Sequence, residues 1–457
     1  MSTANVDALK NNPKKALNAM TLSMMLVLLF PQIEHFITIL WVQGLGTNVV
    51  AAIGFLSFFV ILKSGIGRGV VSGVNTLLSN SIGEGDKKKA NNYMINSILI
   101  SLVVGIISTI IFIFALKPVL IMLGGGDVLQ YSMEYAFIFL IIGTPIYLID
   151  QGLIGILRAE GNAKSNSYST IIACVFNMVF GPIFIYILNW GVKGAALSNM
   201  LSDVVLFVVL LYFLLVKESY FTFSFKNFKF EKSLFSRVLY LGLPGSTDYI
   251  VMAIITAILT YSVSFFGEYQ AITVITSADK IIQLLTTPLI AFSTTLLPVI
   301  GVQMGLKNYK TIKDIFNYSI KKLIILSIIL TIALLILNPL VVSLYSVFGL
   351  SSSLFSSMTF YLFIFSFTFP FSALISISMS MFQGLGKGFH GAMIPLIRHL
   401  ISSTIAMYIL GFVLNMGLFG IYLGILIGFI FTGVVSILWI NNYIGKLIKN
   451  DKNKTIN

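Results

Sequence analysis

The feature that most constrains this chain is a series of apolar runs long enough to cross a lipid bilayer. A transmembrane helix needs about 20 mostly apolar residues, and Gly, Pro and charged residues divide the sequence into twelve such runs. Charged residues make up only 10% of the chain, whereas soluble domains contain about 25%. We therefore expect an all-α integral membrane protein with twelve transmembrane helices, at residues 17–42, 48–82, 90–116, 130–158, 165–189, 192–216, 237–266, 270–304, 309–338, 352–384, 389–415 and 418–445.

The basic residues indicate how these helices are oriented. With the loops numbered from the N-terminus and the charged ends of the spans counted with the adjoining loops, the odd loops contain only Lys117 and Lys193, whereas the even loops and both tails contain 23 of the 29 Lys and Arg residues. Cytoplasmic loops are enriched in Lys and Arg. This asymmetry predicts a multi-pass protein of the cell (plasma) membrane with both termini in the cytoplasm. It also accounts for most of the net charge of +13, so no nucleic-acid partner is needed to explain that charge.

The two halves of the chain share a pattern of glycines. The turn at Gly161 is echoed at Gly386, and the turn at Gly191 is echoed at Gly417, with nearly the same separation along the chain. A constant separation indicates an internal repeat, and repeats of six helices enter the membrane with the same orientation. We expect three regions, a six-helix N-lobe at 1–216, a cytoplasmic linker at 217–236 and a six-helix C-lobe at 237–457. Substrate and ion sites of such folds lie near the bilayer midplane.

The most characteristic motifs lie in the fourth, fifth and sixth predicted helices. The run LRAEGNAKSNSYSTIIACVFNMVFGPIFIYILNWGVKGAALSN, from Leu157 to Asn199, has Asn177 within one helix and a GVKGAA turn before the next, and Pro244 follows Gly-Leu at the start of the seventh helix. This combination resembles the multidrug and toxic compound extrusion (MATE) transporters over roughly residues 15–445. The resemblance implies secondary antiport, in which rocking lobes export a small amphiphilic compound in exchange for protons or sodium ions.

Four positions depart from the pattern of that family. The resemblance leads us to expect an aspartate in the first helix, and Thr38 occupies that position. A second aspartate is expected four residues after Asn177, where this chain has Gly181. In the C-lobe, Met252 and Ser372 occupy positions that are acidic in sodium-type members. The coupling residues of the family therefore cannot be transferred to this chain unchanged.

Glu34 is the candidate for the missing acid. It lies in the run PQIEHFITILW, four residues before Thr38 and therefore on the same face of the helix. A carboxylate in hydrocarbon costs about 2.5–3.5 kcal/mol, so such residues usually face a cavity or a partner. Glu34 would bind or release a proton as its surroundings change, with Asn177 as its hydrogen-bond partner. The alternative is that Glu34 pairs with His35 or a lysine near the interface and only stabilises the structure.

Further polar residues within the predicted spans are candidates for the lining of a substrate or ion cavity. Asp150 and Gln151 lie in the fourth span, and Asp203 lies in the sixth. Asp248 lies in the seventh span, one helical turn before Met252, and is the candidate C-lobe acid. The alternative for Asp150 and Asp203 is a structural hydrogen bond to backbone groups or to Ser and Asn side chains near the helix ends.

Four basic residues within the spans are not assigned to a loop or a tail: Lys63, Arg68, Lys280 and Arg398. A cavity built only for lipophilic cations would more readily omit such residues, so zwitterionic and anionic substrates remain open, and we include Arg398 among the cavity candidates. The alternative is that Lys63, Arg68 and Lys280 form ion pairs between helices or lobes.

Motifs of the common enzyme classes are absent from the sequence. It contains no HExxH, GxSxG or Walker loop, and its three histidines do not have metal-ligand spacing. We expect no enzyme activity, no metal site, no cofactor beyond the transported proton or sodium ion, and a monomer that contacts the lipid bilayer and a small-molecule substrate. The alternatives are a lipid-linked oligosaccharide flippase of the same superfamily and a membrane-embedded protein without transport activity.

Overall fold

The computed structural model describes residues 2–43, 45, 47–122, 128–216, 219–221, 228–265, 269–344 and 355–456. The side chains of Asp248, of 253–277 and of Lys280 are among those outside the described part. Contacts within the chain divide it into two units, which are described separately. The first unit comprises Met1–Tyr249 and Leu297–Leu306, and the second comprises Ile250–Leu296 and Lys307–Asn457.

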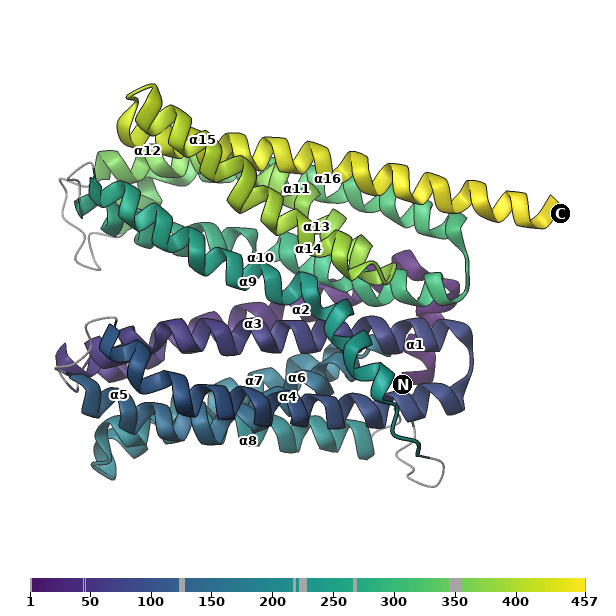
Figure 1. Cartoon of the computed structure of the whole chain (residues 1–457), viewed down its shortest axis with the longest axis horizontal. Helices are drawn as coiled ribbons and strands as arrows, with labels where there is room; N and C mark the ends of the chain where they lie inside the picture. Colours follow the sequence, from purple (N-terminus) through teal and green to yellow (C-terminus); the bar gives the residue numbers. More distant parts are fainter. Residues whose placement is uncertain are drawn as a thin grey trace. The chain divides into compact units, whose positions relative to one another are not determined.

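The described residues form α-helices and short π-helices (Figure 1). The α-helices are α1 (Ser2–Asn11), α2 (Pro13–Gln43), α3 (Thr47–Glu84), α4 (Lys87–Met122), α5 (Leu129–Ala136), α6 (Gly143–Ala159), α7 (Ala163–Pro182), α8 (Gly191–Leu215), α9 (Lys232–Phe265), α10 (Tyr269–Gly305), α11 (Tyr309–Leu344), α12 (Phe355–Ser366), α13 (Phe369–Gly384), α14 (Gly388–Leu396), α15 (Thr404–Tyr408) and α16 (Gly417–Ile456). The π-helices are η2 (Phe137–Ile142), η3 (Ile183–Ile187), η7 (Ile397–Ser403) and η8 (Ile409–Val413).

The predicted spans and the observed helices coincide, and the all-α membrane fold is confirmed. Within the described residues, ten helical segments are long and apolar enough to cross a membrane, and the pair α12 and α13 makes an eleventh if it is one span bent by 48°. The remaining long segment, α9, includes many residues whose side chains are outside the described part. It begins at Lys232 rather than at the predicted 237, so the end of the predicted linker is helical. The predicted lobe boundaries themselves stay a prediction.

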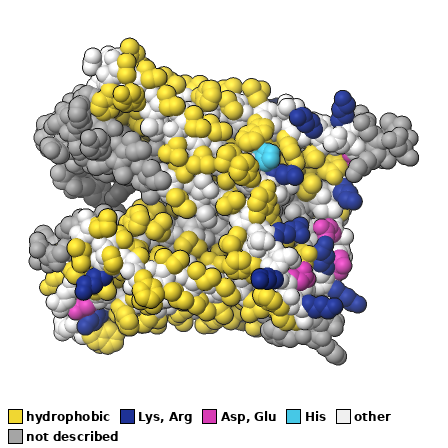
Figure 2. Space-filling view, viewed as in Figure 1, with side chains coloured by type: hydrophobic (Ala, Val, Ile, Leu, Met, Phe, Trp, Pro, Cys, Tyr) yellow, Lys and Arg dark blue, Asp and Glu magenta, His cyan; other side chains and the backbone are white. Residues whose placement is uncertain are grey.

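Exposed apolar side chains cover the helices that would face lipid. Figure 2 shows hydrophobic side chains over the middle of the first unit, and Lys and Arg side chains gathered mainly at the end where α4 begins. On α4, Ile106, Ile110 and Phe114 are 46%, 48% and 76% exposed. A helix satisfies its own backbone hydrogen bonds, so such side chains can contact hydrocarbon without leaving unpaired polar groups there.

The internal repeat is visible in the backbone as well as in the sequence. Gly161 and Gly386 have φ values of +76° and +72°, and Asn189 and Asn415 both have φ of +53°. The π-helices η3 and η8, which lie just before these two asparagines, also correspond in the two halves. A positive φ is uncommon for a residue other than glycine. The recurrence of these features confirms that the two halves share one local architecture.

Close helix packing explains one pair of repeated glycines. A Cβ atom added at Gly194 would lie 2.6 Å from the carbonyl oxygen of Phe184, and one added at Gly420 would lie 2.5 Å from that of Leu410. Both distances are shorter than non-bonded contacts allow, so any larger residue would push the helix away from the preceding π-helix. These glycines therefore fix how α8 and α16 pack at their N-terminal ends.

A buried carboxylate anchors the described part of the linker to the first unit. Glu160 directly follows α6, is 0% exposed, and accepts hydrogen bonds from Ser219 Oγ at 2.7 Å and from the backbone N–H of Tyr220 at 2.9 Å. Burial raises the pKa of the Glu160 carboxyl above its ordinary value, and the hydrogen bonds oppose that shift. The linker is thus attached to the end of α6 by a specific polar contact.

Candidate functional site

Glu34 and Asn177 meet inside the first unit, as the sequence predicts. Glu34 lies on α2 and is half-buried, and Asn177 lies on α7 and is 3% exposed. The side-chain amide of Asn177 donates a hydrogen bond to Glu34 Oε1, and Thr38 Oγ1 donates to the same oxygen at 3.1 Å. Both donors stabilise the ionised form of the carboxyl group. The predicted contact between Glu34 and Asn177 is therefore confirmed, whereas its role in transport stays a proposal.

A chain of polar side chains extends this contact to a third and a fourth helix. Asn177 Nδ2 also donates to Asn199 Oδ1 on α8 at 3.1 Å. Asn199 Nδ2 in turn donates to the backbone oxygen of Ala195 at 2.9 Å and, at 3.4 Å, to the hydroxyl of Tyr135 on α5. Asn177 Oδ1 is buried and makes no hydrogen bond with the described residues. The network therefore has an unused acceptor beside the Glu34 carboxyl group.

The missing second aspartate leaves space next to this network. A Cβ atom added at Gly181 would lie 3.8 Å from Asn177 Oδ1, 3.8 Å from Ser198 Oγ and 3.9 Å from Trp41 Cδ1, which are ordinary van der Waals distances. A side chain at this position would thus reach the same polar cluster. The packing around Gly181 would accept an aspartate, so it does not explain why the expected acid is absent here.

A buried ion pair lies one helical turn along α8 from Asn199. Lys63 on α3 is 2% exposed, and its Nζ lies 3.6 Å from Asp203 Oδ2. Lys63 also donates to the backbone oxygen of Phe139 at 3.3 Å, and its ammonium lies 3.9 Å from the centre of the Phe139 ring and 4.6 Å from that of Tyr147. Aromatic faces attract desolvated cations. For Lys63, the ion-pair alternative is therefore confirmed.

Asp150 and Gln151 lie on α6 beside this pair. Asp150 is 0% exposed, neither of its carboxyl oxygens makes a hydrogen bond with the described residues, and the charges of Lys63 and Asp203 both act on it. Gln151 packs against α3, where its Cγ would lie 2.9 Å from a Cβ atom at Gly67. The alternative of structural hydrogen bonds at helix ends is wrong for Asp150. Asp203 lies near the middle of α8 rather than near its start, and its partner is a lysine.

The polar side chains around Glu34 and Asn177 form one cluster, and Lys63, Asp203 and Asp150 form a second. The two clusters interact electrostatically. The charge of Asp203 acts on Glu34, and both carboxyl groups act on Tyr135, so Asp203 connects the two clusters. Three carboxyl groups and one lysine therefore share the interior of the first unit. Like charges in a region of low dielectric disfavour simultaneous ionisation. A change of protonation at one carboxyl group therefore alters the proton affinity of its neighbours.

The remaining candidates are Arg398 and Asp248. Arg398 belongs to the second unit, where its Nε donates to His399 Nε2 at 3.0 Å and its guanidinium lies 5.3 Å from the centre of the Phe429 ring. Asp248 lies in α9, and its side chain is outside the described part. The second unit has its own acid within a helix, the half-buried Asp279 on α10, which accepts a hydrogen bond from Tyr361 Oη on α12 at 3.0 Å.

Sequence reasoning missed several members of the network. Asn199, Tyr135 and Phe139 were not singled out, and Lys63 was not assigned to Asp203. Asn199 lies at the end of the run that carries the family resemblance, four residues before Asp203, and that helical spacing is a signal for a shared face. Tyr135 and Phe139 have no comparable signal, because aromatic residues are common in apolar helices. Among the described residues, no three His, Cys, Asp or Glu side chains gather closely enough to bind a metal ion.

Three comparisons with known proteins agree on one family. The family model for MatE matches residues 22–183. The chain is 21% identical to an FAD transporter of Shewanella oneidensis over 67% of this chain and 68% of that protein. It is 24% identical to a multidrug export protein of Staphylococcus haemolyticus over 73% of each. A solved outward-facing multidrug resistance MATE transporter of the MOP superfamily matches 97% of this chain and 99% of its own with a TM-score of 0.92 and 27% identity.

These matches span most of the fold and include the helices that form both clusters. The similar proteins are exporters of drugs or a transporter of FAD, so they do not favour the flippase alternative. The all-α membrane fold, the repeated turns and the match to a solved transporter agree with this similarity. The chain is similar to the MATE transporters, in sequence over residues 22–183 by the family model and in fold over nearly its whole length.

Proposed function

We propose that the chain is a secondary antiporter that exports small amphiphilic compounds in exchange for protons or sodium ions, with Glu34 as the coupling acid. The observation that carries the proposal is the contact of the Glu34 carboxyl group with Asn177 and Thr38 in the interior of the first unit. Both donors bind Oε1, and these hydrogen bonds are stronger when the carboxyl group is ionised than when it carries a proton. Ion binding and the geometry of α2 and α7 are therefore linked.

The neighbouring charges give this linkage a direction. The negative charge of Asp203 opposes the ionised form of Glu34, and the hydrogen bonds from Asn177 and Thr38 favour it. A movement of α2 away from α7 would break the hydrogen bond from Asn177, which stabilises the ionised carboxyl group, so Glu34 would bind a proton more tightly in that arrangement. An antiporter needs this difference between its two states, because a ligand shifts an equilibrium only through unequal affinities.

The substrate class follows from the balance of charges. Lys63 neutralises Asp203, while Glu34 and Asp150 are not matched by a cation at hydrogen-bond distance among the described residues. Small cationic or zwitterionic amphiphiles therefore fit the first unit best, and anionic substrates such as FAD, the cargo of one relative, are the competing class. We further propose that the protein acts as a monomer in the cell membrane, with both termini in the cytoplasm and no cofactor beyond the transported ion.

Efflux measurements in a drug-susceptible host test the role of Glu34. We expect Glu34→Gln to lower efflux by about 5- to 150-fold, the range of typical coupling free energies, because the amide cannot exchange a proton. The double variant Glu34→Gln/Thr38→Asp returns an acid to the position where the family resemblance places it, one turn along α2, and should recover part of the loss. Membrane levels of each variant give the folding control. Unchanged efflux by a well-expressed Glu34→Gln variant would contradict the proposal.

A further inference from the structure

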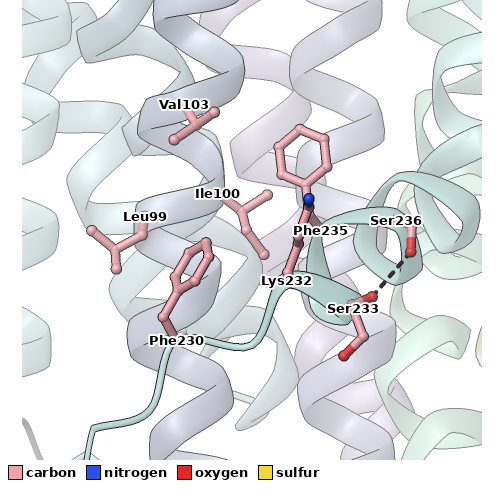
Figure 3. Close-up of a pocket in the computed structure, with 8 residues that line it drawn as sticks. All are labelled: Leu99, Ile100, Val103, Phe230, Lys232, Ser233, Phe235 and Ser236. Atoms are coloured by element: carbon pink, nitrogen blue, oxygen red, sulfur yellow. Dashed lines mark hydrogen bonds between the residues drawn. The ribbon is translucent and has the colours of Figure 1, made fainter.

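A groove on the first unit lies between α4 and the start of α9. Its volume is about 600 Å³, and Figure 3 shows the rings of Phe230 and Phe235 on either side of Ile100 of α4. Small-molecule sites typically occupy about 300–1,000 Å³. Leu99 and Val103 extend the apolar wall along α4, whereas the first turns of α9 contribute Lys232, Ser233 and Ser236. The groove is thus mostly apolar, with Lys232 and two serines on the side formed by α9.

Two asparagines on α4 hold the aromatic wall in place. Asn96 Nδ2 donates to the backbone oxygen of Lys229 at 2.9 Å, and Asn96 Oδ1 accepts from the backbone N–H of Glu231 at 3.1 Å. Asn92 Oδ1 accepts from the backbone N–H of Lys229 at 2.9 Å. These bonds fix the backbone on both sides of Phe230. Residues 92, 96 and 99 share one face of the helix, so the side chain of Phe230 is positioned over the apolar wall.

The apolar wall continues into the lipid-facing surface of the first unit. Phe230 is 64% exposed and Val103 is 40% exposed. Further along α4 the same outward surface includes Ile106 and Ile110, which are 46% and 48% exposed. An apolar chain that lies in the groove would therefore remain in contact with the hydrocarbon of the bilayer. A soluble ligand would have no comparable reason to bind here, because most of the groove wall carries no polar group.

The end of the first unit where α4 and α9 begin has an excess of basic residues. The basic residues are Lys87, Lys88, Lys89, Lys229, Lys232 and Arg237, and the acidic residues are Glu84, Asp86 and Glu231. One acid is already paired, since Lys89 Nζ lies 2.7 Å from Glu84 Oε2. The first turn of α9 contains no acidic residue that would neutralise its positive end. Basic residues next to a transmembrane helix attract anionic lipid headgroups.

We propose that this groove binds one anionic phospholipid of the surrounding bilayer. An acyl chain lies along Leu99 and Val103 and between the two phenylalanine rings, and the phosphate lies beside Lys232 and the serines of α9. The apolar wall and the cation are complementary to the two parts of such a lipid. Because Asn92 and Asn96 attach the same segment to α4, a bound lipid adds a further contact between the linker and the first unit.

Lipid binding to the purified full-length transporter tests this proposal independently of transport. We expect fluorescent phosphatidylglycerol to bind more tightly than phosphatidylcholine. Lys232→Ala should weaken phosphatidylglycerol binding about fivefold, the effect of one lysine near a membrane surface. Lys117→Ala, which removes an exposed lysine at the other end of α4, is the matched control and should leave the affinity within about twofold.

A second pair of variants tests the apolar wall. Val103→Trp fills the groove and should weaken binding of phosphatidylglycerol more than Lys232→Ala does. Ile110→Trp places the same bulk two turns along α4 on the same face and should have no effect on binding. Equal affinity of the two lipids, equal losses in a variant and its control, or displacement of the lipid by inorganic phosphate at millimolar concentration would each overturn the assignment.

Discussion

The two halves of the chain share a backbone but not a charge pattern. The positive φ values at Gly161 and Gly386 show that the turns are repeated. When the two halves are aligned on those glycines, the buried Asp150 of the first half corresponds to Ile375 of the second, which is apolar and 3% exposed. An alignment on Gly191 and Gly417 similarly makes Phe429 the residue that corresponds to Asp203. Duplication thus preserved the packing of the helices, while the ionisable groups of the first half were placed independently of it.

The difference indicates where ion coupling takes place. Among the described residues of the first unit, the charges of Asp150 and Asp203 act on Lys63, and the charge of Asp203 also acts on Glu34. In the second unit, Asp279 is paired with the neutral Tyr361, and Tyr361 is packed between the rings of Phe365 and Tyr422. Several coupled charges can respond together to one bound ion. This contrast between the described residues of the two units supports the proposal that coupling takes place in the first unit.

The largest effect should come from breaking the buried ion pair of the first unit. Asp203→Asn removes the carboxylate that lies nearest to the buried ammonium of Lys63, and we expect a loss of about 3–5 kcal/mol in unfolding free energy. The double variant Lys63→Met/Asp203→Leu resembles the apolar pattern of the second half and should lose much less. Thermal unfolding of the singles and the double in detergent measures the coupling. Additive losses would show that the two residues do not act as a pair.

A smaller effect is expected from the amide that contacts Glu34. Asn177→Ala removes the hydrogen bonds to Glu34 and Asn199, at a cost of about 1–3 kcal/mol for the polar groups left without a partner. Asn338→Ala is the matched control in the second unit, where Asn338 Nδ2 donates to the backbone oxygen of Thr359 at 2.8 Å. Both variants should lower the midpoint of thermal unfolding, and only Asn177→Ala should change the ion dependence of transport. A similar change in Asn338→Ala would erase the contrast between the units.

The contact of Asp279 with Tyr361 in the second unit should matter less for stability and for ion dependence than the contacts of Asn177 do. Tyr361→Phe removes the hydroxyl that donates to Asp279 and retains the ring that packs against Phe365. We expect a loss of about 0.5–1.5 kcal/mol in stability and no change in ion dependence. Tyr408→Phe, at a position that is 61% exposed, controls for removal of a tyrosine hydroxyl. A strong effect of Tyr361→Phe on coupling would mean that the second unit takes part in ion exchange.

The smallest effect concerns Glu160, a buried carboxylate whose hydrogen bonds are satisfied, in contrast to Asp150. Because burial raises the pKa of Glu160, the folded protein binds the proton more tightly than the unfolded chain. The stability contributed by this residue is therefore fully present below the unfolded pKa and declines as pH rises towards the folded pKa. Glu160→Gln should remove this decline, as measured by thermal unfolding at pH 5 and pH 8. Glu84→Gln, at an exposed glutamate, should leave the pH dependence as in the wild type.

Much of the fold could be predicted from local patterns, whereas most of the site could not. Apolar runs predicted the spans because backbone hydrogen bonds in a bilayer must be satisfied within helices. The contact of Glu34 with Asn177 was predicted because the family resemblance indicated Thr38 and Asn177, and Glu34 lies one helical turn from Thr38. The pairing of Lys63 with Asp203 was not predicted, since it joins α3 to α8 and no local spacing reports a contact between distant helices. The π-helices and the early start of α9 were also missed, because hydropathy is insensitive to both.

Counterflow in proteoliposomes tests most directly whether coupling resides in the first unit. Wild type, Glu34→Gln and Asp279→Asn are each reconstituted, and substrate movement is recorded after a proton gradient or a sodium gradient is imposed separately. We predict that one of the two gradients drives transport by the wild type and by Asp279→Asn, and that neither gradient drives Glu34→Gln although it still exchanges substrate at equilibrium. Gradient-driven transport by Glu34→Gln, together with its loss in Asp279→Asn, would contradict the account.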